Sequence, residues 1–178
     1  ILSVIVGHTF SAYDPGSLLN RFIYSFHMPL FFILSGFFCR PQDFKTAFGR
    51  KVKNLLLPYL IINAVRCLIA LEKSGFETML QGYLFPALYG NGSTPKIALC
   101  LFDVKIVGMT WFLIAMFVCQ VLYLCLEEFS KKYGTPMWIL VILMAVTGMG
   151  LNDKVWLPFS IQPAMSALLF YRAGRIMR

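Results

Sequence analysis

Long apolar stretches separated by polar loops constrain the fold of this chain most strongly. A membrane-spanning helix needs about 20 mostly apolar residues. Stretches that approach this length occur at 19–39, 55–71, 108–126, 136–151 and 159–177. A further, truncated stretch opens the chain at Ile1. The pattern predicts an all-α fold, a polytopic transmembrane helix bundle with about six spans in residues 1–178.

The basic residues are clustered, and their positions predict how the helices are oriented. Short cytoplasmic loops collect Lys and Arg, whereas short outer loops do not. One loop contains Arg40, Lys45, Arg50, Lys51 and Lys53. Strict alternation of the spans puts two further clusters on the same side, Lys131–Lys132 and Arg172–Arg178. We therefore expect a multi-pass protein of the cell membrane, with these clusters in the cytoplasm.

Charge and cysteine spacing exclude two classes of ligand. The formal net charge of +8 is explained by the positive-inside bias and by the anionic lipids that attract basic loops. We therefore expect the lipid bilayer as a partner, and no nucleic acid. The cysteines lack the paired spacing of a metal site, and no histidine lies near enough in sequence to complete one. We expect no bound metal.

Two histidines lie in or beside apolar stretches. His27 lies in the run 24–38, about 12 Å into the membrane. An ionisable group at that depth favours a functional role, and the alternative is a packing hydrogen bond to a neighbouring helix. His8 lies near the outer end of the first stretch, where partial burial favours the neutral imidazole that a general base requires. The alternative for His8 is an interfacial residue without a role.

Two further side chains are candidates for substrate binding. Arg66 lies near the outer end of its apolar stretch, where it either extends to the membrane surface or turns inward with Asn63 to hold a carboxylate or phosphate. Trp111 begins a stretch, which is the usual place of an interfacial anchor and also suits stacking on a substrate. The connection 72–107 is long for a structureless loop, and Leu80–Tyr89 is predicted to return into the membrane as a short segment.

Several motifs, taken in order, resemble one family. They are Gly7-His8, the segment 26–37 (FHMPLFFILSGF), the segment 50–59 (RKVKNLLLPY), Trp111-Phe112-Leu113 with Met116-Phe117, and Leu157-Pro158-Phe159 leading to 170–174 (FYRAG). Together they resemble the acyltransferase-3 family of integral membrane O-acyltransferases, and most of all its fucose 4-O-acetylase-like branch. The resemblance covers nearly the whole chain.

The resemblance implies a fold and an activity. It implies a bundle of about ten spanning helices, of which residues 1–178 would be a partial domain without the start of the first helix and without the C-terminal helices. It also implies transfer of an acyl group, such as acetyl, from acyl-coenzyme A to a hydroxyl of a cell-envelope sugar or glycolipid. Acyl-coenzyme A is then a donor substrate, and no bound cofactor is expected.

The resemblance also assigns roles to residues. His8 matches the family histidine proposed as catalytic base, and His27 matches the histidine of the second signature. Arg50 and Lys53 match a basic pair in which the family has two arginines, so the second guanidinium fork is lost here. With Lys51, they are candidates for binding the phosphates of coenzyme A.

Two other classes of function fit the same pattern of helices. A transporter or flippase would use His27 and Arg66 as binding or proton-relay groups. A membrane module that serves a fused soluble enzyme, as in some amino-acid racemases, would carry a similar bundle. A transporter would move unmodified substrate without acyl-coenzyme A, and a fused module would be followed by a soluble domain.

Overall fold

The computed structural model describes residues 18–92, 96–97, 103–151 and 156–178. The chain divides into two compact units, residues 1–40 with 170–178, and residues 41–169. Each unit is described by itself. The first apolar stretch, which opens at Ile1, and the candidate base His8 lie outside the described residues.

The first unit contains helix α2, Leu18–Phe38, and the end of helix α9, Ile161–Ile176. The two backbones pack at van der Waals distance, because a Cβ atom on Gly36 would overlap the carbonyl oxygen of Tyr171 and one on Gly174 would overlap that of Ile33. Small residues permit such close approach between membrane helices. Gly36 and Gly174 therefore permit the close packing of α2 and α9.

Two arginines cap the end of α2. Arg175 and Arg178 donate hydrogen bonds to the carbonyl oxygen of Cys39, at 2.9 and 2.6 Å. The last carbonyls of a helix have no partner within the helix, and its C-terminus carries a partial negative charge. These cations from the end of the chain therefore stabilise the C-terminus of α2.

The second unit begins with one long helix. It consists of α3 (Phe44–Lys51), the π-helical turn η1 (Val52–Leu56) and α4 (Leu57–Ser74), which together span 31 residues. Asp43 caps it by accepting a hydrogen bond from the backbone N–H of Thr46 at 3.1 Å. This hydrogen bond lowers the pKa of the Asp43 carboxyl from its ordinary value. At 1.5 Å per residue the helix is about 46 Å long, which exceeds the hydrocarbon thickness of about 30 Å.

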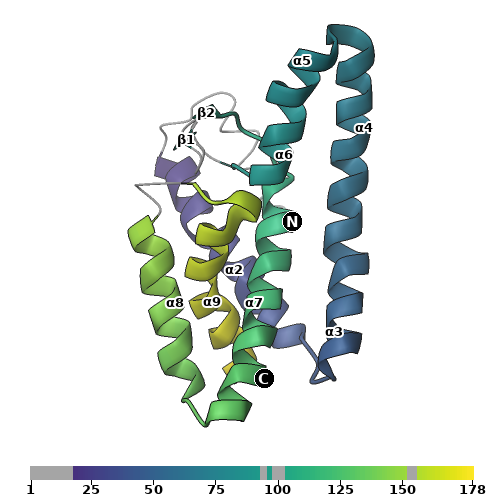
Figure 1. Ribbon diagram of the computed structural model, residues 1–178. Coiled ribbons are helices and arrows are strands. Elements are labelled where there is room, and N and C mark those ends of the chain that lie inside the picture. Colours follow the sequence, from purple (N-terminus) through teal and green to yellow (C-terminus); the bar gives the residue numbers. More distant parts are fainter. Residues whose placement is uncertain (1–17, 93–95, 98–102, 152–155) are drawn as a thin grey trace. The chain divides into compact units, whose positions relative to one another are not determined.

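The connection after this helix folds back along it. Gly75, with φ 82°, ends α4, and α5 (Phe76–Met79), η2 (Leu80–Leu84) and α6 (Phe85–Tyr89) return beside α4 (Figure 1). Leu80–Tyr89 is thus helical, whereas its return into the membrane stays a prediction. A short antiparallel pair follows, in which β1 (Lys96–Ile97) is joined to β2 (Asp103–Val104).

The remaining helices of the unit form its core. They are α7 (Trp111–Tyr133), α8 (Met137–Leu151), the 3₁₀ turn η3 (Pro158–Ser160) and the first part of α9. Ile114, Ala145 and Leu168 are almost fully buried. A Cβ atom on Gly148 would lie 2.7 Å from Met165, so α8 and α9 also pack closely.

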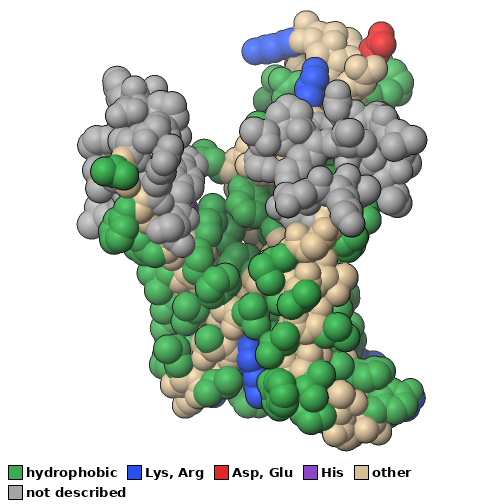
Figure 2. All heavy atoms as spheres, turned by 90° about the vertical axis from the view of Figure 1, so that its left-hand side faces the viewer, with side chains coloured by type: hydrophobic (Ala, Val, Ile, Leu, Met, Phe, Trp, Pro, Cys, Tyr) green, Lys and Arg blue, Asp and Glu red, His purple; other side chains and the backbone are tan. Residues whose placement is uncertain are grey.

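The described part of the chain contains two helices long and apolar enough to cross a membrane, Phe44–Ser74 and Trp111–Tyr133. The apolar helices Phe26–Phe38 and Met137–Leu151 are shorter. Large apolar side chains such as Trp138, Leu143 and Val146 on α8 are exposed, and hydrophobic side chains cover much of the face on which α8 lies (Figure 2). All five long apolar stretches form helices and the all-α class is confirmed, whereas the number of six spans stays a prediction.

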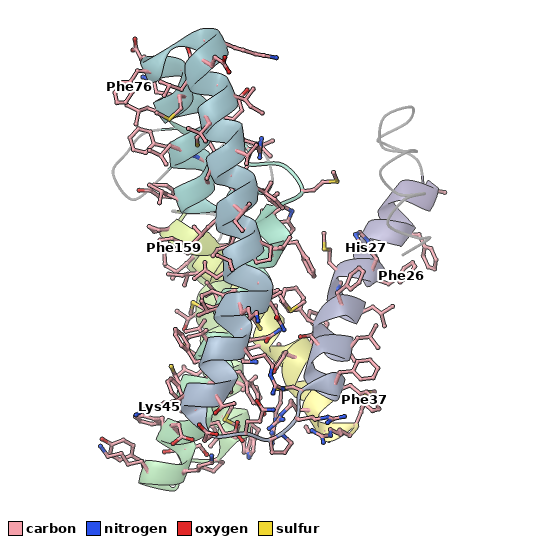
Figure 3. All side chains as sticks on the ribbon, turned by 90° about the vertical axis from the view of Figure 1, so that its right-hand side faces the viewer. Phe26, His27, Phe37, Lys45, Phe76 and Phe159 are labelled. Carbon is pink, nitrogen blue, oxygen red and sulfur yellow. The ribbon has the colours of Figure 1, made fainter. Side chains whose placement is uncertain are left out.

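The basic clusters of the second unit lie at one end of it. Lys45 lies at the opposite end of the long helix from Phe76 (Figure 3). The end of α7, which carries Lys131 and Lys132, lies toward the same end as α3 (Figure 1). This arrangement within residues 41–169 agrees with the side assigned to both clusters by the positive-inside bias.

Candidate functional site

The basic end of the long helix contains the three residues predicted to bind coenzyme A. Arg50 and Lys51 close α3, and Lys53 lies in η1. The Lys51 side chain is buried, and its Nζ donates a hydrogen bond to Oε1 of Gln120 on α7 at 2.7 Å. Arg50 and Lys53 are exposed. The structure therefore separates a buried Lys51, which joins α3 to α7, from two solvent-accessible cations.

Arg50 and Lys53 lie on one side of the helix. Residues three positions apart are neighbours on a helix surface, and π-helical turns such as η1 are frequent at functional sites. When the Gln42 amide is oriented with its oxygen toward Arg50, that oxygen accepts hydrogen bonds from the guanidinium at 2.7 and 3.1 Å. A neutral partner leaves the positive charge of Arg50 available to a phosphate.

Arg66 lies much farther along the same helix. Lys51 and Arg66 are about 15 residues apart, or about 22 Å along the axis. Arg66 is partly buried, and its Nη1 donates to the carbonyl oxygen of Val107 at 2.6 Å and to Oδ1 of Asn63 at 3.5 Å. Its guanidinium lies 5.6 Å from the centre of the Tyr83 ring. Arg66 makes no ion pair with any carboxylate that the structure describes.

Trp111 lies at the beginning of α7, close in sequence to the Val107 carbonyl that binds Arg66. Its ring is half-buried and packs directly on Gly92, where a Cβ atom would overlap the indole. Gly108, with φ 81°, accepts a hydrogen bond from the Trp111 backbone N–H at 3.2 Å. The segment 107–111 thus links the Val107 carbonyl that binds Arg66 to the start of the helix that carries Trp111.

Side chains and backbone from several segments bind the carbonyl groups at the end of α6. These bonds are Tyr59 Oη to Ala87, Trp156 Nε1 to Tyr89 at 3.1 Å, Ser160 Oγ to Gly90, and Val107 N to Asn91 at 2.8 Å. Asn91 and Ser160 are fully buried. Buried backbone carbonyls require such partners, so this network fixes the end of α6 against α4, the 107–111 segment and η3.

An apolar pocket lies between α4, α6, α7 and η3. Its volume is about 490 Å³, and Leu60, Ala64, Cys67, Leu88 and Phe159 are among the residues that line it. The polar lining residues Tyr59 and Asn63 bind main-chain carbonyls, Tyr59 that of Ala87 and Asn63 that of Tyr59. The pocket therefore offers mainly hydrocarbon to a ligand.

His27 lies on α2, in the first unit. It is 2% exposed, and its side chain projects from a different side of α2 than the exposed Phe26 (Figure 3). This burial is by other parts of the protein, and the depth of His27 in the membrane stays a prediction. The catalytic roles of His8 and His27, and the binding roles of the other candidates, stay predictions.

Several residues at the site were not singled out by the sequence analysis. Gln120, Ser160 and Gln162 are buried polar residues, and Gln162 Oε1 accepts a hydrogen bond from the Leu157 backbone N–H at 2.9 Å. A polar residue inside an apolar stretch was the available signal for Gln120 and Gln162. No group of three His, Cys, Asp or Glu side chains in the described part of the chain is arranged to hold a metal ion.

Comparison with known proteins gives one result. The family model Acyl_transf_3, described as an acyltransferase domain, matches residues 1–177. No curated protein and no solved structure matches the chain.

Proposed function

The chain belongs to the acyltransferase-3 family, and from this premise we propose that it transfers an acyl group, such as acetyl, from acyl-coenzyme A to a hydroxyl of a cell-envelope sugar or glycolipid. The observation that carries the proposal is the family match over residues 1–177. The two long apolar helices support activity at a membrane. The fucose 4-O-acetylase-like branch and the position in the cell membrane are part of the proposal.

The donor is proposed to bind at the basic end of the long helix. The exposed Arg50 and Lys53 support this, because two cations on one helix face suit the phosphates of coenzyme A. Lys51 is buried against Gln120, so its contribution is to hold the helix on which the other two lie. Removal of either exposed cation is expected to raise KM for the donor about tenfold, with kcat little changed.

The acceptor is proposed to bind near Arg66 and Trp111, about 22 Å along the long helix from Lys51. A donor of this kind has a long, narrow pantetheine arm, so its thioester can lie far from the phosphates. The proximity of the 107–111 segment to Arg66 supports an acceptor site there.

The proposed reaction is direct transfer. His8 accepts the proton of the acceptor hydroxyl while that oxygen attacks the thioester carbonyl, and an ester bond forms as the carbon–sulfur bond breaks. The departing thiolate of coenzyme A takes the proton from the His8 imidazolium, which restores the neutral base. A positioned histidine contributes about 10²–10⁴ in rate. His27 is the second catalytic candidate.

The experiment that tests this proposal measures acyl transfer directly. Membranes containing the full-length protein, or its His8→Ala or His27→Ala variant at equal abundance, receive isotopically labelled acetyl-coenzyme A, and the surface glycan is analysed by mass spectrometry. Lys73→Gln, an exposed change on α4, is the control. The label should enter the glycan as an ester with the wild type and the control, and fall at least about 100-fold with His8→Ala.

Retention of full labelling by His8→Ala would refute the role of His8. Absence of labelled ester in the wild type, with labelled acetyl-coenzyme A still intact, would refute the proposed donor or acceptor.

A further inference from the structure

The apolar pocket of the second unit has the properties of a site for a hydrocarbon chain. Its volume of about 490 Å³ lies within the range of small-molecule sites. The hydroxyl of Tyr59 and the amide nitrogen of Asn63 donate to main-chain carbonyls. A ligand inside the pocket therefore meets apolar side chains and satisfied polar groups, which favours an aliphatic occupant over a sugar.

The rim of the pocket lies on a helix that is apolar and long enough to cross a membrane. Leu60 and Leu68 of α4 and Leu88 of α6 line the pocket and are themselves 53%, 66% and 43% exposed. In a membrane these side chains face lipid tails. The pocket is thus accessible to a chain that enters from the bilayer.

The part of the pocket wall formed by η3 has a strained backbone. Phe159, which lines the pocket, has φ 58° and ψ 29°, and Ser160 beside it has φ 53°. A bulky residue in this left-handed region is rare, and it persists only where the surroundings hold it. Here the hydrogen bond from the Ser160 hydroxyl to the Gly90 carbonyl holds the turn from which Phe159 lines the pocket.

A cation lies beside the pocket. Arg66 binds Asn63, which lines the pocket, and lies between the lining residues Ala64 and Cys67 on the same helix. Its partners are a carbonyl, an amide oxygen and an aromatic ring, all of them uncharged. A partly buried guanidinium with neutral partners retains its full charge and suits a planar, anionic group such as phosphate.

The depth of Arg66 agrees with a lipid headgroup. If the 31-residue helix Phe44–Ser74 is centred in the bilayer, Arg66 lies about 10 Å from the midplane, or about 5 Å inside the hydrocarbon boundary. A side chain of this length reaches the boundary region from there. Arg66 is then placed to meet the headgroup of a lipid, and the apolar pocket is placed to hold its hydrocarbon chain.

We propose that this pocket binds a membrane lipid, with one hydrocarbon chain between α4, α6, α7 and η3 and its phosphate on Arg66. The site shares Arg66 with the proposed acceptor site, but lipid binding needs neither His8 nor coenzyme A and is therefore tested independently of acyl transfer. Failure of the proposed acyl transfer would not refute lipid binding, and failure of lipid binding would not refute acyl transfer.

The test measures which lipids stay on the full-length protein. The protein is purified in mild detergent, incubated with equal amounts of phosphatidylglycerol and phosphatidylcholine, and analysed by native mass spectrometry. The anionic phosphatidylglycerol should be retained in preference to the zwitterionic phosphatidylcholine. Arg66→Gln should reduce the retention of phosphatidylglycerol about tenfold, because a charge-assisted bond is lost, while Arg66→Lys and Lys73→Gln should keep most of it.

A second pair of variants tests the pocket. Ala64→Trp fills it, whereas Val65→Trp places the same ring on the next residue of α4, which does not line the pocket and is 49% exposed. Thermal unfolding in detergent identifies any variant that fails to fold, and Ala64→Leu replaces Ala64→Trp in that case. Only the pocket-filling variant should lose bound lipid.

Three outcomes would overturn the proposal. The first is equal retention of phosphatidylglycerol by Arg66→Gln and Lys73→Gln. The second is an equal loss of bound lipid with Ala64→Trp and Val65→Trp. The third, in a competition measurement, is displacement of phosphatidylglycerol by glycerol phosphate as readily as by a lipid. The last result would mean that the phosphate binds without the tail.

Discussion

Replacing Gly174 by alanine should destabilise the first unit, although alanine is the better helix former. The new Cβ atom would overlap the carbonyl oxygen of Ile33 on α2. Gly36→Ala should behave in the same way, because its Cβ atom would overlap the carbonyl oxygen of Tyr171 on α9. Both obstacles are main-chain atoms, so no change of side-chain rotamer relieves them and the helices must separate.

The expected loss of unfolding free energy in these two variants is the difference between two opposed contributions. Overpacking of this kind costs up to about 3 kcal/mol, and the higher helix propensity of alanine offsets about 1 kcal/mol. Each variant should therefore lose about 2 kcal/mol of unfolding free energy. Gly49→Ala and Gly150→Ala are matched controls, since both glycines are helical and nothing lies within 4 Å of the added Cβ atom. They should gain up to about 1 kcal/mol.

The assay is denaturant-induced unfolding of the full-length protein in detergent, followed by circular dichroism and tryptophan fluorescence. The double variant Gly36→Ala/Gly174→Ala should lose less than the sum of the single losses, because the first substitution already separates the helices that the second would push apart. Equal stability of Gly174→Ala and Gly150→Ala would refute the reasoning, since the close approach of α2 and α9 is the only difference invoked.

Three further predictions concern the second unit. Gln120→Leu should cost about 1–3 kcal/mol in the same unfolding assay, because it removes one hydrogen-bond acceptor of the buried Lys51 ammonium, and adding Lys51→Met should recover most of that loss; no recovery would mean that the charge is not the cause. Gly90→Ala should destabilise more than Gly134→Ala, since both have positive φ but only at Gly90 would the Cβ meet other atoms, and equal melting temperatures would contradict this. Asp43 has a lowered pKa in the folded protein because its carboxylate accepts backbone and side-chain hydrogen bonds, so its contribution is present above the unfolded pKa of about 4 and is lost as pH falls through the folded value. The melting temperatures of wild type and Asp43→Ala should therefore converge below about pH 4, and a difference that persists unchanged would refute the cap.

The sequence by itself determined which segments form helices. The stretches predicted at 19–39, 108–126, 136–151 and 159–177 form α2, α7, α8 and α9 with ends shifted by a few residues, or up to seven for α7. The reason is that apolar length is a property of the local sequence. The family was also identifiable from sequence, because each of its motifs is a short run of neighbouring residues.

The tertiary structure alone decided what each polar residue contacts. Three basic residues lie close together in the sequence, Arg50, Lys51 and Lys53. Only Lys51 is buried, and it contacts Gln120 on another helix. The Val107 carbonyl that binds Arg66 is also far away in sequence. The pocket arises because η3 and α6 fold back against α4 and α7, and such long-range packing has no local signal. Local patterns fix which segments are helical, whereas contacts between helices depend on how distant residues meet in space.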